Sequence, residues 1–316
     1  MWHFLSFLAL ILGSPHNLAK MPSASFFIRT LALIGPALIV CSLTAALKSA
    51  GVVGRVLGVG RDTASVHKAQ ELGLIDAPAT LPEAVAHADV VVLATPVRTI
   101  GMLLKEMRPY LKAHTVITDV GSTKADVVAM GQQYLQDHFE RFVAGHPIAG
   151  AETTGPEAAR ADLYPERNVV LTPTAHTCPQ AQRLVTQMWM HCGARVLLMD
   201  PAEHDEVLAS VSHVPHFLSS VFMWQVASAE NADLRLSLAG SGFRDFTRIA
   251  AGSAEVWRDI FLSNKQAVLR ELKEVREAFA RAEQALLESN EESLYDFLER
   301  AALARRLWAS RSGYHE

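Results

Sequence analysis

A histidine held between glycine and proline is the residue of this chain best suited to move a proton. His146 lies in the segment 145–150, which reads Gly-His-Pro-Ile-Ala-Gly. Glycine permits close backbone approach and proline fixes φ, so the pattern predicts an imidazole on a stiff turn. Such an imidazole suits general acid–base catalysis. A loop histidine that hydrogen-bonds to a neighbouring carbonyl group is the alternative interpretation.

Four more short segments contain side chains whose types suit binding or catalysis. They read Gly-Ser-Thr-Lys at 121–124, Ser-His-Val-Pro-His at 212–216, Gly-Phe-Arg-Asp-Phe-Thr-Arg-Ile at 242–249 and Trp-Arg-Asp-Ile at 257–260. His213 and His216 are three residues apart and share one face if their segment is helical. Contact with a substrate and capping of a helix N-terminus are both open for this pair. Two histidines without a third ligand nearby do not make a zinc site, so we expect no metal.

Short β-branched runs alternate with helical patterns over the first two thirds of the chain. Strands are expected at 31–34, 55–59, 90–93, 115–118, 168–171 and 195–199, and helices at 38–50, 63–72, from 124 and 180–191. This alternation predicts an α/β fold with a Rossmann-like, doubly wound parallel sheet. The strand signal disappears after Asp200-Pro201. We therefore expect a dinucleotide-binding domain at 30–200 and an all-helical domain at 201–316.

Residues 1–29 precede the expected core. The run from Trp2 to Leu12 is apolar, but it is too short for a membrane span and lacks the basic start of a signal peptide. We favour an extension from an upstream start site over a weak targeting segment or a peripheral anchor. Residues 1–29 are thus expected to lie outside the core fold, and no membrane association is expected.

The overall composition excludes several classes of partner. The chain has 316 residues and a formal net charge of -4, so it has no basic footprint for nucleic acid. Cys41, Cys178 and Cys192 are odd in number and have no metal-ligand spacing. They indicate free thiols in a reducing compartment, and we expect a cytoplasmic protein.

The first β–α turn of a doubly wound sheet is where a nucleotide binds. A dinucleotide fingerprint would place glycine at 35, 37 and 40, but only Gly35 is present. Ala37 adds a methyl group where the backbone should approach a pyrophosphate, and Val40 adds a branched side chain where helix and strand should pack closely. The N–H groups of Leu38 and Ile39 and the helix dipole still favour a phosphate. We expect binding that is weakened but retained.

The end of the second predicted strand bears on the choice of cofactor. An acidic residue at position 60 would bind a ribose hydroxyl and favour NAD, but the chain has Gly60 followed by Arg61. Glycine leaves room for a 2′-phosphate with a cation beside it, which favours NADP over NAD. A solvated surface arginine is the alternative interpretation.

Taken in order, the five segments resemble the prephenate/arogenate dehydrogenase family of tyrosine biosynthesis, from about residue 31 to residue 290. The resemblance implies a nicotinamide-binding domain joined to a helical domain that dimerises, with the active site between them. It implies oxidative decarboxylation of prephenate to 4-hydroxyphenylpyruvate, or of arogenate to tyrosine, with hydride transfer to NAD(P)+. It also implies a homodimer formed through the C-terminal helices.

The resemblance assigns a role to each candidate side chain. His146 would draw off the proton of the ring hydroxyl, and Ser122 would orient this hydroxyl and the histidine. Arg248 would hold a substrate carboxylate, which suits its planar guanidinium. His213 and His216 would contact the side-chain carboxylate or the keto or amino group. The expected cofactor contacts are Gly35, Ala37, Leu38, Ile39, Arg61, Thr95 and Pro96.

Two other functions remain possible at this point. One is a family member that binds substrate but has lost its cofactor, which Ala37 and Val40 motivate. The other is a β-hydroxyacid dehydrogenase using Asn264-Lys265, which would leave His146 without a role.

The segment from Lys265 onward has apolar residues in alternating four-three spacing. These residues are Val268, Leu272, Val275, Phe279, Ala282 and Leu286. Packing on its own domain and a helix–helix dimer seam are equally compatible with so short a repeat.

Overall fold

The computed structural model describes residues 25–150 and 155–312, which form two compact units divided after Lys265. Most of the expected extension lies outside the described residues. The expected end of that extension at residue 29 is wrong, because Ile28 is buried at the start of the first strand. Phe26 also packs against the core and stacks on His191 with ring centroids 4.9 Å apart.

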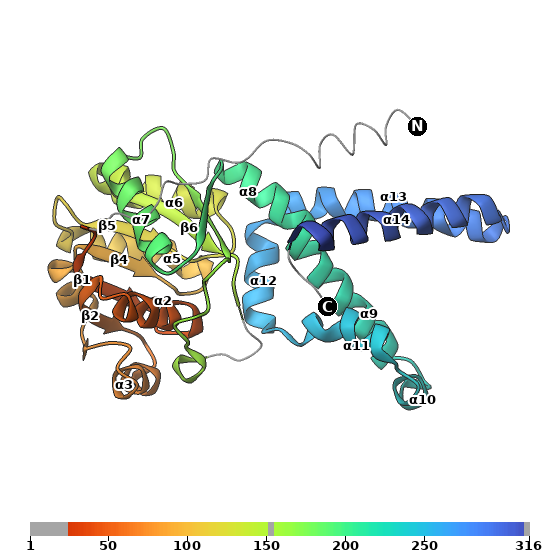
Figure 1. Ribbon diagram of the computed structural model, residues 1–316, viewed down its shortest axis with the longest axis horizontal. Helices are drawn as coiled ribbons and strands as arrows, with labels where there is room; N and C mark the ends of the chain where they lie inside the picture. The colour runs from red at the N-terminus through yellow and green to blue at the C-terminus, as the bar shows by residue number, and fades with distance from the viewer. Residues whose placement is uncertain (1–24, 151–154, 313–316) are drawn as a thin grey trace. The chain divides into compact units, whose positions relative to one another are not determined.

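An eight-stranded sheet forms the centre of the first unit, in the order β3-β2-β1-β4-β5-β6-β7-β8 (Figure 1). The neighbouring strands from β3 to β6 pair in parallel, whereas β6 and β7 pair antiparallel, so β7 and β8 run the opposite way. The strands are β1 Ile28–Ile34, β2 Val53–Val59, β3 Ala77–Pro78, β4 Val90–Leu93, β5 Val116–Asp119, β6 Phe142–Pro147, β7 Asn168–Thr172 and β8 Arg195–Leu198.

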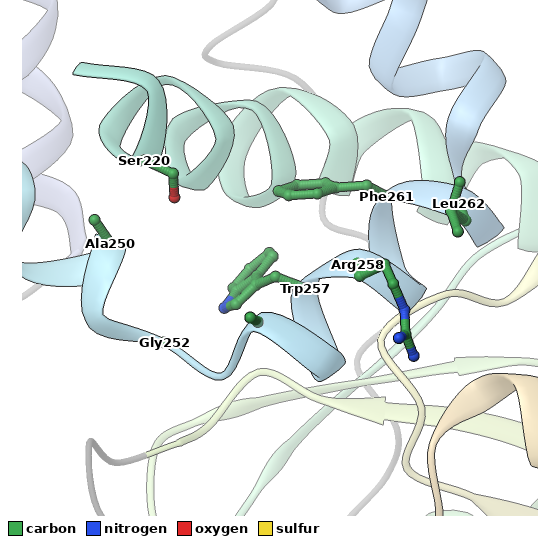
Figure 2. A pocket seen from close by; sticks show the side chains of 8 residues that line it. Ser220, Ala250, Gly252, Trp257, Arg258, Phe261 and Leu262 are labelled. Atoms are coloured by element: carbon green, nitrogen blue, oxygen red, sulfur yellow. The ribbon is translucent and has the colours of Figure 1, made fainter. Parts of the chain in front are cut away.

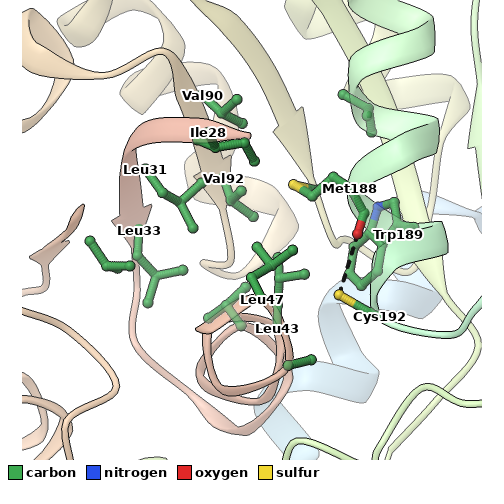
Figure 3. Close-up of a cluster of buried hydrophobic side chains, with 14 of the residues drawn as sticks. Ile28, Leu31, Leu33, Leu43, Leu47, Val90, Val92, Met188, Trp189 and Cys192 are labelled. Atoms are coloured by element: carbon green, nitrogen blue, oxygen red, sulfur yellow. Dashed lines mark hydrogen bonds between the residues drawn. The ribbon is translucent and has the colours of Figure 1, made fainter. Parts of the chain in front are cut away.

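Helices cover both faces of this sheet, which confirms the doubly wound α/β fold. They are α2 Leu38–Ser49, α3 Thr63–Glu71, α4 Leu81–His87, α5 Val97–Met107, α6 Ala125–Leu135 and α7 Pro179–His191. Successive strand residues point to opposite faces. Leu31 and Leu33 therefore pack with α2 and α7 in one core cluster, while Ala32 and Ile34 pack with α4, α5 and α6 in the other. Figure 3 shows the first of these clusters.

Local capping explains where two of these helices begin. Asp62 accepts hydrogen bonds from the N–H groups of Ala64 and Ser65 and caps α3. Helix α4, which was not predicted, begins with a capping box between Thr80 and Glu83. The signal for α4 was present in the sequence, since a threonine stands three residues before a glutamate.

The described chain after Leu198 contains no strand, as expected. The helices of the first unit in this region are α8 Pro201–Leu208, α9 Val214–Ala227, α10 Ala232–Ser237, α11 Ser241–Thr247 and α12 Ala254–Ser263. A π-helical turn, Ala209–His213, joins α8 to α9. Helix α13 is Lys265–Leu287, and all of it after Lys265 belongs to the second unit, together with α14 Glu291–Ser312. In α13, Val268 is buried while Phe279 and Leu286 are exposed.

One helical stretch of the described chain, Pro201–Ala227, is long and apolar enough to cross a membrane by length and composition alone. It nevertheless carries His204, Asp205 and His213, all of them buried. Buried ionisable groups in a hydrogen-bonded network are typical of a helix that packs inside a protein, and we interpret the stretch in this way.

Candidate active site

Four of the sequence-predicted residues lie at the carboxyl ends of parallel strands, at one edge of the sheet. Gly35 follows β1, Thr95 follows β4 and Ser122 follows β5, while His146 is the penultimate residue of β6. The carboxyl ends of parallel strands share one edge, and the strand order reverses between β1 and β4. Ligands of doubly wound sheets bind at such a reversal.

The structure corrects the local setting of His146. The segment was expected to be a stiff turn, but His146 lies within strand β6, where it pairs with Val170 of β7. Pro147 is the last residue of β6, a position that tolerates the missing N–H group. The imidazole is therefore held by a sheet ladder, which is a stiffer support than a turn.

The first β–α turn keeps the backbone geometry that a phosphate needs. Gly35 has φ +88°, and a Cβ atom there would lie 3.0 Å from the carbonyl oxygen of Ala94 and 3.0 Å from Cγ2 of Thr95. Both the positive φ and these close contacts require glycine at this position. Ala37 is exposed and extended at the N-cap of α2, with φ -130° and ψ 175°.

The residues of this turn fit a bound pyrophosphate. Leu38 and Ile39 occupy the first turn of α2, whose N–H groups have no partner within the helix. Val40 is fully buried in the core cluster shared by α2 and α7. The helix thus packs on the sheet with valine at this position, and Ala37 stays exposed at the N-cap of the helix.

Packing explains the glycine at the end of β2. A Cβ atom on Gly60 would lie 2.8 Å from Cγ2 of Val66 and 3.1 Å from Cδ of Pro36. The carboxylate of Asp62 caps α3. Arg61 is exposed and forms no ion pair with another residue of the described ranges. The end of β2 therefore presents the cation of Arg61, while the nearby carboxylate of Asp62 is already used to cap α3.

The imidazole of His146 contacts a second histidine that the sequence analysis did not single out. Nδ1 of His146 lies 2.9 Å from Nε2 of His204, and the two rings meet edge to face. Burial lowers the pKa of His146 well below its ordinary value, and the nearby His204 and Lys124 add to this effect. The imidazole is thus neutral near pH 7, as a general base must be.

The second histidine is held by a buried carboxylate. Nδ1 of His204 lies 2.8 Å from Oδ1 of Asp205. Asp205 also accepts hydrogen bonds from the backbone N–H groups of Lys124, at 2.7 Å, and Ala125, at 2.9 Å. Burial alone would raise the pKa of Asp205, but the hydrogen bonds from His204 and the two amides hold it below its ordinary value.

A buried ion pair connects the loop after β5 to β6. Lys124 and Asp119 form this pair, and both side chains are fully buried. Asp119 also accepts hydrogen bonds from the backbone N–H groups of Gly121, at 2.8 Å, and Gly145, at 3.0 Å. One carboxylate thereby fixes the residue before His146 and the residue before Ser122.

The side chain of Ser122 is half-buried in the loop after β5. Within the described residues, no hydrogen bond joins Ser122 to His146. The protein group that orients His146 in this structure is His204.

The pair His213 and His216 does not cap a helix. The π-helical turn joins α8 and α9 without a break, and His213 makes no side-chain cap bond. The Nδ2 group of Asn264 donates to the backbone carbonyl of Asp205, at 2.6 Å, and lies 3.1 Å from Nδ1 of His213. Because Nδ1 must then accept, the hydrogen of His213 is on Nε2, which is buried without a partner among the described residues.

Trp257 connects this histidine pair to a pocket. The ring of His216 stacks on Trp257 with centroids 3.5 Å apart, and His213 meets the same indole edge-on. Burial lowers the pKa of both histidines to about 4. Trp257 also lines a pocket of about 440 Å³, with Ser220 of α9 and Ala250 on its wall (Figure 2).

Arg248 follows α11 and lines a second pocket, of about 600 Å³, together with Arg244. His216 forms a hydrogen bond with the backbone of Ile249, the next residue along the chain. The structure thus links Arg248 to the histidine pair through the backbone.

Comparison with known proteins places the chain in a family. Residues 43–198 match the model described as "Prephenate dehydrogenase, nucleotide-binding domain", and residues 200–300 match "Prephenate dehydrogenase, dimerization domain". The cyclohexadienyl dehydrogenase of Zymomonas mobilis is 39% identical over 211 residues, covering 63% of this chain and 71% of the relative. This chain belongs to the prephenate dehydrogenase family.

Other members of the prephenate dehydrogenase family agree in sequence and structure. The prephenate dehydrogenase of Bacillus subtilis is 36% identical over 243 residues, covering 76% of this chain and 65% of that protein. The crystal structure of prephenate dehydrogenase from Aquifex aeolicus, in complex with hydroxyphenyl propionate and NAD+, has a TM-score of 0.84 at 32% identity. The similarity covers 89% of this chain and 99% of that chain. As a member of this family, the chain is an NAD(P)-dependent oxidoreductase.

Membership in the prephenate dehydrogenase family also decides between the alternatives for Asn264. The β-hydroxyacid interpretation gave this residue a catalytic role, but its side chain is buried and joins Asp205 to His213. Lys265 begins α13. No sequence signal separates His204-Asp205 from an ordinary polar pair near a helix start, so both residues were missed.

Proposed function

We propose that this chain catalyses the oxidative decarboxylation of prephenate to 4-hydroxyphenylpyruvate in tyrosine biosynthesis, with arogenate as the alternative substrate. The observation that carries the proposal is the neutral imidazole of His146 at the edge of a nucleotide-binding sheet. Its Nδ1 is occupied by His204, so Nε2 is the nitrogen available to a substrate. A cofactor-impaired member is not favoured, because the turn after β1 retains the geometry that a phosphate needs.

The chemistry places a distinct demand on each side chain. The bound nicotinamide would accept hydride from the ring carbon that carries the hydroxyl group. His146 takes the hydroxyl proton as the carbonyl forms, and the carboxylate on the opposite ring carbon leaves as CO2. The electron pair of the broken C–C bond makes the ring aromatic and the oxygen a phenolate, which takes the proton back from the imidazolium to give the phenol. We propose that Ser122 orients the substrate hydroxyl. His213 presents a buried N–H donor, which suits a keto oxygen or a carboxylate.

The decisive experiment titrates the purified protein with NADP+ and NAD+ by calorimetry. Prephenate or arogenate is then added, and the absorbance of the reduced nicotinamide is followed. Binding followed by turnover supports the proposal and identifies the cofactor and the substrate. A folded protein that binds neither nucleotide would support the impaired alternative instead.

Arg248→Gln is expected to raise KM for the substrate by about ten- to a hundredfold. Glutamine keeps a polar group but loses the charge-assisted contact with a carboxylate, which contributes about 1.5 to 3 kcal/mol. Steady-state kinetics with saturating nucleotide measures the effect. Arg244→Gln is the matched control, because Arg244 lines the same pocket. A KM that rises only in the control would transfer the carboxylate-binding role to Arg244.

We propose that NADP is favoured over NAD as the cofactor. The exposed Arg61 and the missing carboxylate at residue 60 support this preference. The proposed cofactor contacts are Gly35, Ala37, Leu38, Ile39, Arg61, Thr95 and Pro96.

Ala37→Gly is expected to tighten binding of both nucleotides by a few fold. The methyl group stands at the N-cap of α2, and glycine is accepted at N-caps. Calorimetry with each nucleotide measures the affinity. Ala50→Gly, at the exposed C-cap of the same helix, controls for a general effect of glycine on α2. An unchanged affinity in Ala37→Gly would show that the methyl group does not hinder the phosphate.

We propose a homodimer formed through the C-terminal helices. The description of residues 200–300 as a dimerization domain supports this assembly. Large apolar side chains are exposed on α9, α10 and α11, including Trp224, Leu234 and Phe246. A monomer in sedimentation velocity at micromolar concentration would contradict the proposal.

The boundary between the domains is proposed to lie between residues 200 and 201. Support comes from the two family matches, which end at 198 and begin at 200, and from the start of α8 at Pro201. A cytoplasmic location is proposed as well, and the three unpaired cysteines of the described chain are consistent with it.

A further inference from the structure

We propose that His204 and Asp205 select the tautomer of His146 and thereby hold its Nε2 atom ready to accept a proton. Asp205, His204 and His146 form one hydrogen-bonded chain across two elements, β6 and α8. The use of this tautomer in catalysis rests on the proposed function, but the tautomer itself does not. His204 and Asp205 act through His146, so they are positioning residues.

The carboxylate end of the chain is fixed in place. Asp205 receives one backbone N–H group on each oxygen, from Lys124 and Ala125 at the start of the eleven-residue helix α6. A helix N-terminus favours negative charge. The pKa of Asp205 lies below its ordinary value because these two amides and His204 outweigh the effect of burial. Asp205 is therefore ionised at neutral pH and can only accept hydrogen bonds.

The tautomers follow from this carboxylate one after another. Because Asp205 only accepts, Nδ1 of His204 must carry a hydrogen. Burial lowers the pKa of His204, so its ring is neutral and Nε2 has no hydrogen. That bare nitrogen must accept from Nδ1 of His146, at 2.9 Å. His146 is neutral too, so its own Nε2 is bare.

The chain also balances the proton that His146 receives. When the substrate O–H bond breaks and an N–H bond forms on Nε2, His146 becomes an imidazolium that still donates from Nδ1 to His204. The groups facing the two imidazoles are Asp119 at the end of β5, Lys124 from the loop after β5, His213 from the π-helical turn, and Asp205. Asp205 is the anion that is hydrogen-bonded to His204, so its negative charge stabilises the imidazolium of His146.

Nitrogen NMR on histidine-labelled protein tests the tautomer without any substrate. The signal of His146 is assigned from its absence in His146→Asn. We expect a protonated Nδ1 and a bare Nε2 in the unsubstituted protein near pH 7. In Asp205→Asn the amide can donate to His204, which reverses both tautomers and moves the hydrogen of His146 to Nε2. A hydrogen on Nε2 of His146 in the unsubstituted protein would overturn the proposal.

Kinetics of three variants tests whether the tautomer matters for turnover. Asp205→Asn is expected to lower kcat by about a hundredfold or more, since a reversed tautomer of a catalytic histidine can cost about 10⁴-fold. KM and nucleotide affinity should change little. His204→Leu should also lower kcat, whereas in His204→Gln the amide oxygen can replace Nε2 as acceptor and restore most of the activity. Equal losses in His204→Leu and His204→Gln would indicate a purely structural role.

Matched controls separate this proposal from the proposed function. Glu203→Gln removes one carboxylate from the exposed face of the same helix and should leave kcat and the NMR signals unchanged. Circular dichroism checks that each variant is folded. If the unsubstituted protein does not turn over prephenate or arogenate, the proposed function fails, while the NMR result still decides the tautomer.

Discussion

His146→Asn is expected to lower kcat by about two to four powers of ten, the range of a general acid–base group, while nucleotide affinity stays unchanged. Asparagine is well suited to the test, because its amide N–H can still donate to His204 in place of Nδ1. What it lacks is a basic nitrogen for the substrate. Stopped-assay kinetics with saturating nucleotide measures kcat, and calorimetry measures nucleotide binding.

His67→Asn is the control for this substitution, because His67 is exposed on α3. The pH dependence adds a second readout. Burial places the pKa of His146 below the ordinary value of about 6.5. The base form is lost only below that depressed pKa, so kcat/KM should stay level through pH 6.5 and decline only at a lower pH. A kcat for His146→Asn within about twofold of the unsubstituted enzyme would rule out the proton-transfer role.

Lys124→Met is expected to destabilise the protein by about 3 to 5 kcal/mol, because it leaves the carboxylate of Asp119 buried without its cation. That is a large part of the stability of a typical domain, which is about 5 to 15 kcal/mol. Methionine fills a similar volume, so the loss of stability comes from the unpaired charge of Asp119 and not from a cavity. Urea unfolding followed by tryptophan fluorescence measures it.

The double variant Lys124→Met with Asp119→Leu is the informative control. Removing both charges leaves neither member of the pair buried without its partner, so the double variant should be more stable than the sum of the two single losses predicts. Strict additivity of the two losses would show that the charges are not coupled. The hydrogen bond from Gly145 to Asp119 is lost in this variant, so some activity should be lost as well.

The sheet was predictable from the sequence because its central strands are buried on both faces. A continuous β-branched run such as 90–93 has few other interpretations. Strand β6 was not predictable in the same way, because glycine and proline around His146 are typical of a turn. Its pairing with β7, antiparallel to the rest of the sheet, is set by contacts distant in sequence.

The candidate site was predictable only in part, for a related reason. His146 stands out by its immediate neighbours, and Arg248 and His213 were recognised by the order of their segments. His204 lies 58 residues from His146, in a helix start whose Asp200-Pro201 pattern signals a cap and not a catalytic contact. Only the packing of α8 against α6 and β7 brings it into contact, and local sequence carries no signal for such a contact.

The crowding around Gly60 limits how the cofactor preference of this enzyme can be changed. An aspartate introduced at residue 60 would collide with Val66 and with Pro36. Pro36 belongs to the turn proposed to hold the pyrophosphate, so pressure on it would displace the proposed phosphate site together with the proposed ribose site. An acidic group meant to favour NAD therefore has to be placed at residue 61, where the side chain is exposed and the turn is not disturbed.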